Sequence, residues 1–331
     1  MKNLIRKTRE FKQGHPFILM NLICVFTVAL ITVIYLINFN LSDDIDDHRW
    51  ESYVSNHGLI FEDEAFEKAV FKQLGFSSSK MNKDYIKEIT YLEIIDDSQV
   101  ENLSDLKFFT SLEYLKIVNC NVSDISPIVN LKNLIVLDLS GNGISDVTPL
   151  GEIKKLQALA IRENKINNAD ALGKIQHLIN LDISFNKIKS VDFIENNKNI
   201  EILNAGHNKI STLKSLNKLK YLTDLLLDTN KIEDIDFMKN NKTIKVLNIS
   251  HNHVKDLSPL LTCKAFEELR LYGVKYVDLS PLQKIESFNS IYLSKYFDRS
   301  QIDFLIGNFK NADRFSKVYL IEKYRGFKAD V

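Results

Sequence analysis

The sequence is poor in the residues that cross-link or interrupt a small fold. Its 331 residues include only 3 cysteines, 5 prolines and 1 tryptophan. Cys24 lies in an apolar run, and Cys120 and Cys263 are separated by more than six periods of the repeat that organises the chain. That separation is too great for the roughly 4.4–6.8 Å Cα spacing of a disulfide. The cysteines therefore predict neither a disulfide framework nor a metal site.

The sequence has no excess of positive or negative charge, because it contains 43 Lys and Arg residues and 43 Asp and Glu residues. A chain without a basic field is not expected to bind nucleic acid. The sequence has no glycine-rich phosphate loop, no G-x-S-x-G and no H-E-x-x-H. His251 and His253 resemble half of a metal site, but a catalytic zinc usually has three protein ligands and no third is evident. We expect no catalytic residue, metal, cofactor or small-molecule substrate, and so no enzyme.

One long apolar run is present near the N-terminus. From Phe17 to Phe39 there is no charged residue. About 20 apolar residues cross the hydrocarbon core of a bilayer as a helix. Residues 16–40 are therefore predicted to be a transmembrane signal anchor, through which the protein associates with a membrane.

The charges that flank this run predict its orientation. Residues 1–15 carry Lys2, Arg6, Lys7, Arg9 and Lys12 against one Glu, whereas acidic residues dominate just after the run. The positive-inside rule places the N-terminus in the cytoplasm and the rest of the chain outside it, in a periplasm or at the cell surface. A cleaved signal peptide is the alternative, but its apolar region is shorter and ends in a small-residue cleavage site.

The strongest pattern is an internal repeat of 22 residues, L-x-x-L-x-L-x-x-N-x-I. Its second apolar position is leucine in eight consecutive copies: Leu115, Leu137, Leu159, Leu181, Leu203, Leu225, Leu247 and Leu269. The next apolar position follows two residues later, which places both side chains on one face of a short strand. One repeat buries perhaps six apolar side chains worth about 1.5–3 kcal/mol each, while ordering its backbone costs about 1–2 kcal/mol per residue. Single repeats therefore cannot fold alone, and stacked repeats form a solenoid with a parallel sheet on one side.

The ninth position of the repeat holds asparagine in six consecutive copies: Asn142, Asn164, Asn186, Asn208, Asn230 and Asn252. An asparagine amide both donates and accepts hydrogen bonds. At a point where the chain turns inward, it can satisfy buried backbone groups that no strand pairing reaches. We interpret these residues as a structural asparagine ladder.

Four of the five prolines fall on one position of the repeat, in the motifs Asp124–Ile128, Asp146–Leu150, Asp256–Leu260 and Asp278–Leu282. With these motifs the sequence resembles the leucine-rich repeats of the bacterial internalin family. The stretch Ile60–Leu74 looks like the helical cap that precedes the repeats in that family, with Phe66, Val70 and Leu74 on one helical face. The resemblance implies a protein-binding role through the concave strand face. The predicted N-terminal anchor is a departure from the family.

The predicted fold is a leucine-rich-repeat solenoid with a parallel β-sheet on its concave face and a short 3-10 or extended convex side. An α-helical N-terminal cap and a single transmembrane helix precede it. The expected boundaries are a cytoplasmic tail at 1–15, the anchor at 16–40, a polar linker at 41–58, the N-terminal cap at 59–88, repeats at 89–287, and a degenerate repeat with a C-terminal cap at 288–331.

Candidate partner-binding residues are those that flank the buried leucines of each strand. Exposed aromatic and arginine side chains are the usual anchors of protein interfaces. The residues selected on this basis are Tyr114, Arg162, Phe185, His207, Asp228, Arg270, Tyr272 and Tyr292. The alternative is that much of this face is simply solvated sheet.

The leading functional hypothesis is a membrane-tethered module that binds a protein partner through its concave face without catalysis. An intracellular regulatory scaffold is the alternative, because 22-residue repeats also occur in the leucine-rich-repeat subunit of protein phosphatase 1. The apolar run at 16–40 counts against that alternative.

Overall fold

The computed structural model describes residues 61–74, 83–263, 267–274, 277–285, 290–294, 297–303, 305 and 317–321. The expected membrane anchor at 16–40 and the linker at 41–58 lie outside the described residues. Within the described ranges, no helix combines the length and the apolar character needed to span a bilayer.

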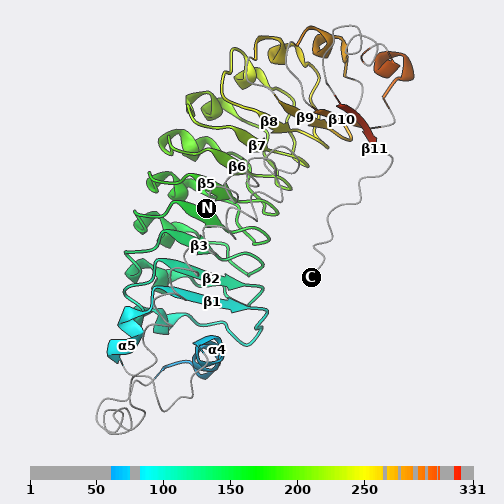
Figure 1. Cartoon of the computed structure of the whole chain (residues 1–331). Helices are drawn as coiled ribbons and strands as arrows, with labels where there is room; N and C mark the ends of the chain where they lie inside the picture. The colour runs from blue at the N-terminus through cyan, green and yellow to red at the C-terminus, as the bar shows by residue number, and fades with distance from the viewer. Residues whose placement is uncertain are drawn as a thin grey trace, which may run out of the picture. The chain divides into compact units, whose positions relative to one another are not determined.

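The repeats form one parallel sheet in which each strand pairs with the strand of the next repeat (Figure 1). The described strands lie in the sheet in the same order as in the chain. They are β1 (Tyr91–Ile95), β2 (Tyr114–Val118), β3 (Val136–Asp138), β4 (Ala158–Ala160), β5 (Asn180–Asp182), β6 (Ile202–Asn204), β7 (Asp224–Leu226), β8 (Val246–Asn248), β9 (Glu268–Leu271), β10 (Ser290–Ser294) and β11 (Lys317–Ile321). The predicted parallel sheet of a leucine-rich-repeat solenoid is thereby confirmed.

The core lies directly behind this sheet. In β2, Leu115 and Ile117 are fully buried, while the residues between and beside them face outward. Leu115 pairs with Leu137, so equivalent leucines stand one above another along the stack. The 22-residue period therefore fixes the register, because a slip of one residue would turn the whole apolar set outward.

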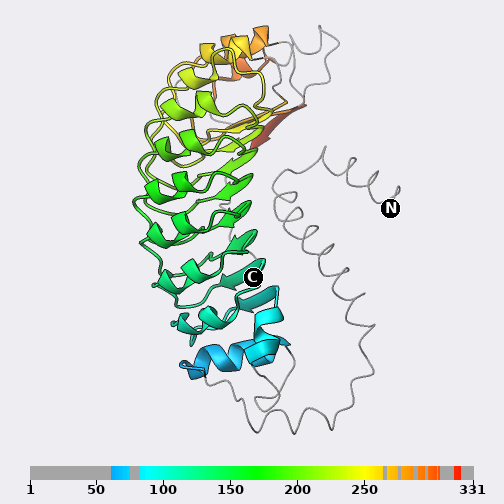
Figure 2. The ribbon, with the colours of Figure 1, turned by 90° about the vertical axis from the view of Figure 1, so that its left-hand side faces the viewer.

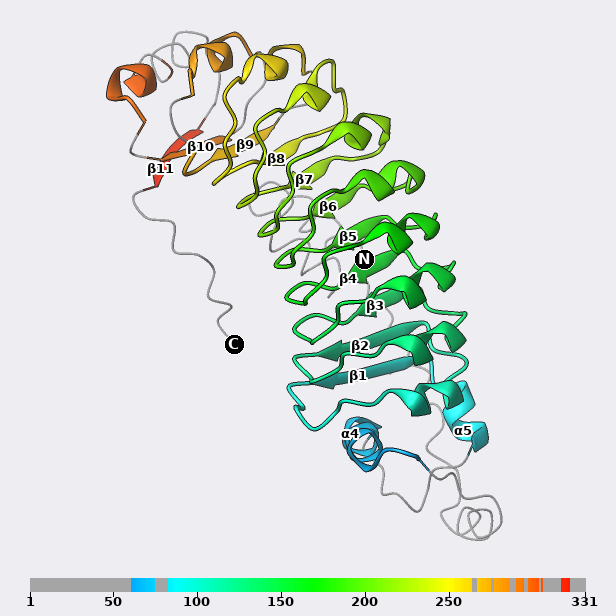
Figure 3. The same ribbon diagram turned by 180° about the vertical axis from the view of Figure 1, so that it is seen from behind.

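Short 3-10 helices form the opposite side of each repeat (Figures 2 and 3). They are η2 (Ser104–Phe108), η3 (Ser126–Asn130), η4 (Thr148–Glu152), η5 (Asp170–Lys174), η6 (Asp192–Asn196), η7 (Lys214–Lys218), η8 (Asp236–Met238), η9 (Ser258–Thr262) and η10 (Ser280–Lys284). A proline stands in the first turn of η3, η4, η9 and η10, where its missing N–H costs no hydrogen bond. The predicted short 3-10 side is confirmed.

The asparagines of the repeat link each turn to the repeat before it. The Nδ2 group of Asn186 donates to the carbonyls of Ile161, Ile183 and Ser184 at 3.0, 3.2 and 3.1 Å. Its Oδ1 accepts from the backbone N–H of Ile166 at 3.0 Å. The other five make the same set of bonds in their own repeats: Asn142, Asn164, Asn208, Asn230 and Asn252.

The residue one before each ladder asparagine adopts the left-handed conformation. Glycine adopts it at Gly141 (φ 68°), as does Gly273 (φ 64°) ahead of Val274 at the equivalent position, but Phe185 (φ 54°) and His207 (φ 52°) adopt it with full side chains. Non-glycine residues are uncommon in this region. The N–H of Phe185 donates to the carbonyl of Gly206 in the next repeat at 3.0 Å, and equivalent bonds recur along the stack. Pairing between repeats therefore offsets the conformational cost.

Two helices precede the first strand, α4 (Glu64–Leu74) and α5 (Lys83–Glu88). On α4, Phe66 and Val70 are fully buried in the same core as the repeats, while Leu74 is only partly buried. The carboxylate of Asp105, itself fully buried in the first repeat, accepts the N–H groups of Glu62 and Asp63 just ahead of α4. The sequence pattern did not single out α5.

The far end of the described chain continues the sheet. Residues 299–303 are helical. Further along the chain, β11 pairs in parallel with β10. This segment therefore extends the repeat sheet by one strand.

Substitution of a ladder asparagine tests the role of these hydrogen bonds. Asn186→Leu leaves buried backbone groups such as the Ile166 N–H unpaired, which should cost about 1–3 kcal/mol of unfolding free energy. Urea denaturation followed by circular dichroism measures the change. Asn167→Leu, at an exposed position, is the control and should leave the midpoint nearly unchanged. Equal stability of the two variants would contradict the structural role of the ladder.

Candidate functional site

Three columns of side chains cover the outer face of the sheet, one before, one between and one after the two buried residues of each strand. We call them the first, second and third columns of the concave face. The pairing register keeps each column continuous along the stack. The second column consists of Glu93, Lys116, Asp138, Ala160, Asp182, Asn204, Leu226, Asn248, Arg270 and Tyr292. The third includes Ser140, Arg162, Ser184, Gly206, Asp228, Ser250, Tyr272 and Ser294.

Asp or Asn in the second column is paired with a small residue in the third. Asp182 Oδ1 accepts from the N–H and the hydroxyl of Ser184 at 2.9 and 2.6 Å. Asp138 bonds to Ser140 in the same way. The side chain of Asn204 accepts from the N–H of Gly206 at 3.2 Å, and Asn248 accepts from the N–H of Ser250. These local bonds hold the polar side chains against the sheet and limit their freedom to rotate.

Further bonds connect neighbouring strands in the middle of the face. Asn204 Nδ2 donates to Asp182 Oδ2 at 3.0 Å, and Asn248 Nδ2 donates to Asp228 Oδ1 at 2.9 Å. A Cβ atom at Gly206 would lie 2.8 Å from Asp228 Oδ1, so glycine makes room for this carboxylate. The centre of the concave face is therefore a rigid polar surface.

Burial sets the electrostatics of this centre. It raises the pKa of Asp182 and of Asp138, although the bonds from Ser184 and Ser140 and the charge of Arg162 act in the opposite direction. The side chain of Arg162 is 37% exposed and forms an ion pair with Glu163. Arg162 is thus a partly exposed cation, paired with Glu163, beside carboxylates that are largely buried.

Aromatic side chains gather towards both ends of the sheet. Near its start, the rings of Tyr91 and Tyr114 stack with centroids 4.6 Å apart. Near its other end, Tyr272 and Tyr292 meet edge to face at 6.1 Å, and the guanidinium of Arg270 lies 5.5 Å from the centre of the Tyr292 ring. Glu268 accepts a hydrogen bond from Arg270 at 2.6 Å and fixes its orientation.

A second group of rings lies on the left-handed turns beside the third column. The rings of Phe185 and His207 stack at 4.0 Å with planes 9° apart. His207 Nε2 lies 3.4 Å from Asp228 Oδ2. Two repeats beyond His207, burial lowers the pKa of His251. Phe185 is 40% exposed and is one of the few large apolar side chains that the described surface presents.

The structure places the eight predicted binding residues in different settings. Arg270, Tyr272 and Tyr292 form one cluster, whereas Phe185 and His207 lie on turns rather than in strand columns. Two others offer little surface, because Tyr114 is only 6% exposed and Asp228 only 5%. Exposure was expected of both, but the ring of Tyr114 is covered by Tyr91 and the carboxylate of Asp228 lies in the polar network.

Two asparagines in the centre of this face were not predicted from the sequence. Asn204 and Asn248 were not selected, although they bridge strands in its centre. Their signal was available: each occupies the same repeat position as Asp138 and Asp182, with Gly or Ser two residues later.

Among the residues that the structure describes, no group of three His, Cys, Asp or Glu side chains could hold a metal ion.

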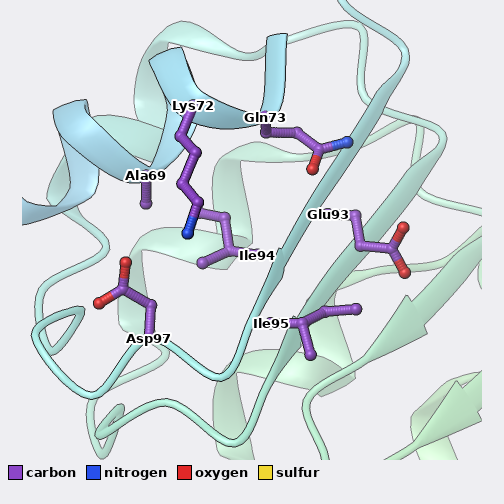
Figure 4. Close-up of a pocket in the computed structure, with 7 residues that line it drawn as sticks. All are labelled: Ala69, Lys72, Gln73, Glu93, Ile94, Ile95 and Asp97. Carbon is purple, nitrogen blue, oxygen red and sulfur yellow. The ribbon is translucent and has the colours of Figure 1, made fainter. Parts of the chain in front are cut away.

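A shallow pocket of about 230 Å³ lies between α4 and β1. Ala69, Lys72 and Gln73 line it from the helix, and Glu93, Ile94, Ile95 and Asp97 line it from the strand and the turn that follows (Figure 4). Its walls contain no pair of groups arranged for acid–base or nucleophilic chemistry. The pocket belongs to the junction between the helix and the first strand.

Comparison with known proteins agrees with this architecture. Residues 110–152 match the family model for Leucine Rich repeats (2 copies). The chain has a leucine-rich-repeat fold. No curated protein sequence matches it.

Solved structures extend the similarity over most of the repeats. An internalin C2 of Listeria monocytogenes aligns with a TM-score of 0.56 and 22% identity, covering 71% of this chain and 94% of its own. An internalin of the same organism, InlF, aligns with a TM-score of 0.51 and 19% identity, covering 80% and 92%. A leucine-rich-repeat protein of Leptospira interrogans gives 0.55 and 17%, covering 84% and 77%. The expected likeness to internalins is confirmed at the level of the fold.

The buried carboxylates generate a prediction about pH. Because burial raises the native pKa of Asp182, the folded protein holds this proton more tightly than the unfolded chain does. Stability from this group therefore falls as pH rises from the ordinary value of 3.8 through the higher native value. Asp182→Asn should remove this loss and flatten the dependence of Tm on pH above 3.8, although it also gives up the hydrogen bond that Asn204 Nδ2 donates to Asp182 Oδ2.

Thermal unfolding across this pH range checks the prediction. Asn is tolerated at equivalent positions of the repeat, at Asn204 and Asn248. Asp170→Asn removes the charge of an exposed side chain and is the control. A Tm of Asp182→Asn that falls with pH above 3.8 as steeply as that of the unmodified protein would contradict the prediction.

Proposed function

We propose that this protein is a membrane-tethered leucine-rich-repeat module that binds a protein partner through its concave face and performs no catalysis. Residues 16–40 are the proposed anchor, and the repeats lie outside the cytoplasm. Leucine-rich-repeat domains typically act as protein-interaction modules, and solenoids offer extended concave surfaces for that purpose. A plant peptide hormone receptor of similar fold was solved in complex with RGF2; it aligns with a TM-score of 0.53, and this chain covers 46% of it.

The observation that carries the proposal is the cluster of Arg270, Tyr272 and Tyr292. Arginine and tyrosine dominate the energetics of protein interfaces. Here the cation, the two rings and the supporting Glu268 already hold one another in place. Binding would therefore lose little side-chain entropy. The polar network of the second and third columns continues this surface towards Arg162.

The anchor and the orientation rest on the sequence. The uncharged run Phe17–Phe39 and the basic residues before it support an N-terminus in the cytoplasm. With the repeats on the other side, partners are envelope proteins or proteins from outside the cell. The regulatory scaffold in the cytoplasm is the alternative that a reversed topology would favour.

Topology is tested by protease treatment of cells that express the full chain with a C-terminal tag. We expect the tag to be cleaved in intact cells or in spheroplasts without lysis. A cytoplasmic reporter protein is the control and should stay intact. Protection of the tag in both preparations, lost only on lysis, would place the repeats in the cytoplasm.

The binding face is tested by photocrosslinking in the native host. p-Benzoylphenylalanine in place of Tyr272, Tyr292 or Phe185 should give the same discrete protein adduct, because Tyr272 and Tyr292 lie in the columns of the proposed face and Phe185 lies on a turn beside the third column. Substitution of Tyr221 is the matched control, since this tyrosine is 58% exposed and precedes strand β7 outside the three columns. Adducts are detected by immunoblotting and identified by mass spectrometry. An adduct from the Tyr221 position alone would place the interface elsewhere.

A further inference from the structure

The turn that follows β8 holds the backbone of the cluster formed by Arg270, Tyr272 and Tyr292. The N–H of His251 donates to the carbonyl of Tyr272 at 2.5 Å, and the hydroxyl of Ser250 accepts from the N–H of Tyr272 at 3.0 Å. This turn therefore binds both backbone groups of Tyr272. Because the ring of Tyr272 meets that of Tyr292 edge to face, the geometry of the cluster depends on the conformation of residues 250 and 251.

The imidazole of His251 is closely packed on this turn. Its backbone is left-handed, with φ 53°. A Cβ atom at Gly273 would collide with Nδ1 and Cε1 of the ring, so the glycine makes room for it. The other ring nitrogen, Nε2, is shielded from solvent. Protonation would place a positive charge on a ring whose two nitrogens are both covered, and this is unfavourable as long as the ring stays in place.

Three effects act on the protonation of His251. Burial is the largest and holds the pKa of His251 below the ordinary value of 6.5. The carboxylate of Asp228, on the turn after β7, acts in the opposite direction and raises this pKa. His207, on the turn after β6, lowers it further. The net result is a histidine that the closed turn keeps neutral.

The carboxylate of Asp228 is already engaged by other groups. Its Oδ1 accepts from Asn248 Nδ2 at 2.9 Å, and its Oδ2 lies 3.4 Å from His207 Nε2. His207 therefore has a carboxylate beside its ring, whereas the ring of His251 packs against Gly273. The two histidines occupy the same repeat position but differ in what an added proton would meet.

Other charges on this turn and on β9 interact away from the His251 ring. His253 is exposed and acts on the carboxylate of Glu233, which also pairs with Lys255. On β9, Arg270 pairs with Glu268. These groups therefore do not replace the missing counterion of a protonated His251.

The sign of the pH effect follows from linkage. A turn that opens and exposes His251 to water accepts the proton that the closed turn disfavours. Because the pKa of His251 is lower in the closed turn, the free energy of opening decreases as pH falls below 6.5 and is unaffected above it.

We propose that acidification opens the turn at His251, frees Tyr272 and thereby weakens binding of the protein partner at the concave face. The effect on a partner rests on the proposed function of the cluster. Once its two backbone bonds are lost, Tyr272 has to be ordered again when a partner binds, and this ordering lowers the affinity. The partner is held near neutral pH and released in mildly acidic surroundings.

The chain itself suggests the variant that removes the proton and keeps the packing. At the equivalent repeat position, Asn119 lies over Gly141 as His251 lies over Gly273, and it has the same φ of 53°. His251→Asn therefore replaces the histidine with a side chain that this turn already accommodates elsewhere. His207→Asn is the matched control, because it removes a histidine from the same repeat position beside Asp228.

Opening is measured by hydrogen–deuterium exchange of the full chain in nonionic detergent at pH 7 and pH 5. Exchange at the N–H groups of His251 and Tyr272 is corrected for its intrinsic dependence on pH. Protection should fall between threefold and about 30-fold from pH 7 to pH 5, the upper bound being set by the ordinary pKa of 6.5. In His251→Asn it should stay within twofold, whereas His207→Asn should retain the loss.

The effect on the partner is measured by crosslinking with p-benzoylphenylalanine in place of Tyr292, in permeabilised cells buffered at pH 7 and pH 5. The yield of the adduct should fall at least threefold at pH 5, and the fall should be absent when the same chain carries His251→Asn. Circular dichroism melting verifies that each variant is folded.

Equal corrected protection at the two pH values, or the same loss in His251→Asn, would overturn the opening of the turn. Opening without a change in adduct yield would overturn its effect on binding. An adduct that is absent at both pH values would contradict the proposed function and with it the release of a partner, while exchange alone would still decide whether the turn opens.

Discussion

The hydrogen bonds of the ladder asparagines are the constraint on which the rest of this molecule depends. Each amide satisfies carbonyls of its own turn and of the preceding repeat and accepts a backbone N–H from that repeat. Without such bonds, the inward turn after each short strand would bury unpaired backbone groups, which costs more than a typical hydrogen bond contributes. Because the amide spans two repeats, it also fixes their spacing and register. The sheet and its continuous columns follow from that.

The surface of the stacked repeats has regions with different chemistry. The second and third columns hold their polar groups through bonds such as Asp182 to Ser184 and Asn204 to Asp182. Partly exposed side chains stand where this network ends, at Arg162 and in the cluster around Tyr292. A solenoid can carry such independent surfaces because each repeat contacts only its neighbours. A change in one region therefore need not disturb the others.

The period of the sequence was enough to predict the solenoid, its strands and its 3-10 side. Leucine at 22-residue intervals leaves one arrangement that buries every copy, and proline at one position excludes a long helix on the back. The candidate site was harder to predict, since exposure depends on neighbours in adjacent repeats. Tyr114 matched the pattern of an anchor, yet Tyr91 covers its ring. Phe185 and His207 lie on left-handed turns that bonds between repeats stabilise, and residue preference alone does not predict that conformation. The helix α5 has no strong periodicity, and so its six residues escaped notice.

Side-chain footprinting tests most directly the proposal that the concave face is the protein-binding surface. Hydroxyl-radical labelling is compared between the full chain in cells of its native host and the same chain purified in detergent. We expect lower labelling in cells at Phe185, Tyr272 and Tyr292, with Tyr221 unchanged. Equal labelling of these three residues in both samples, or protection confined to Tyr221 and the 3-10 side, would contradict it.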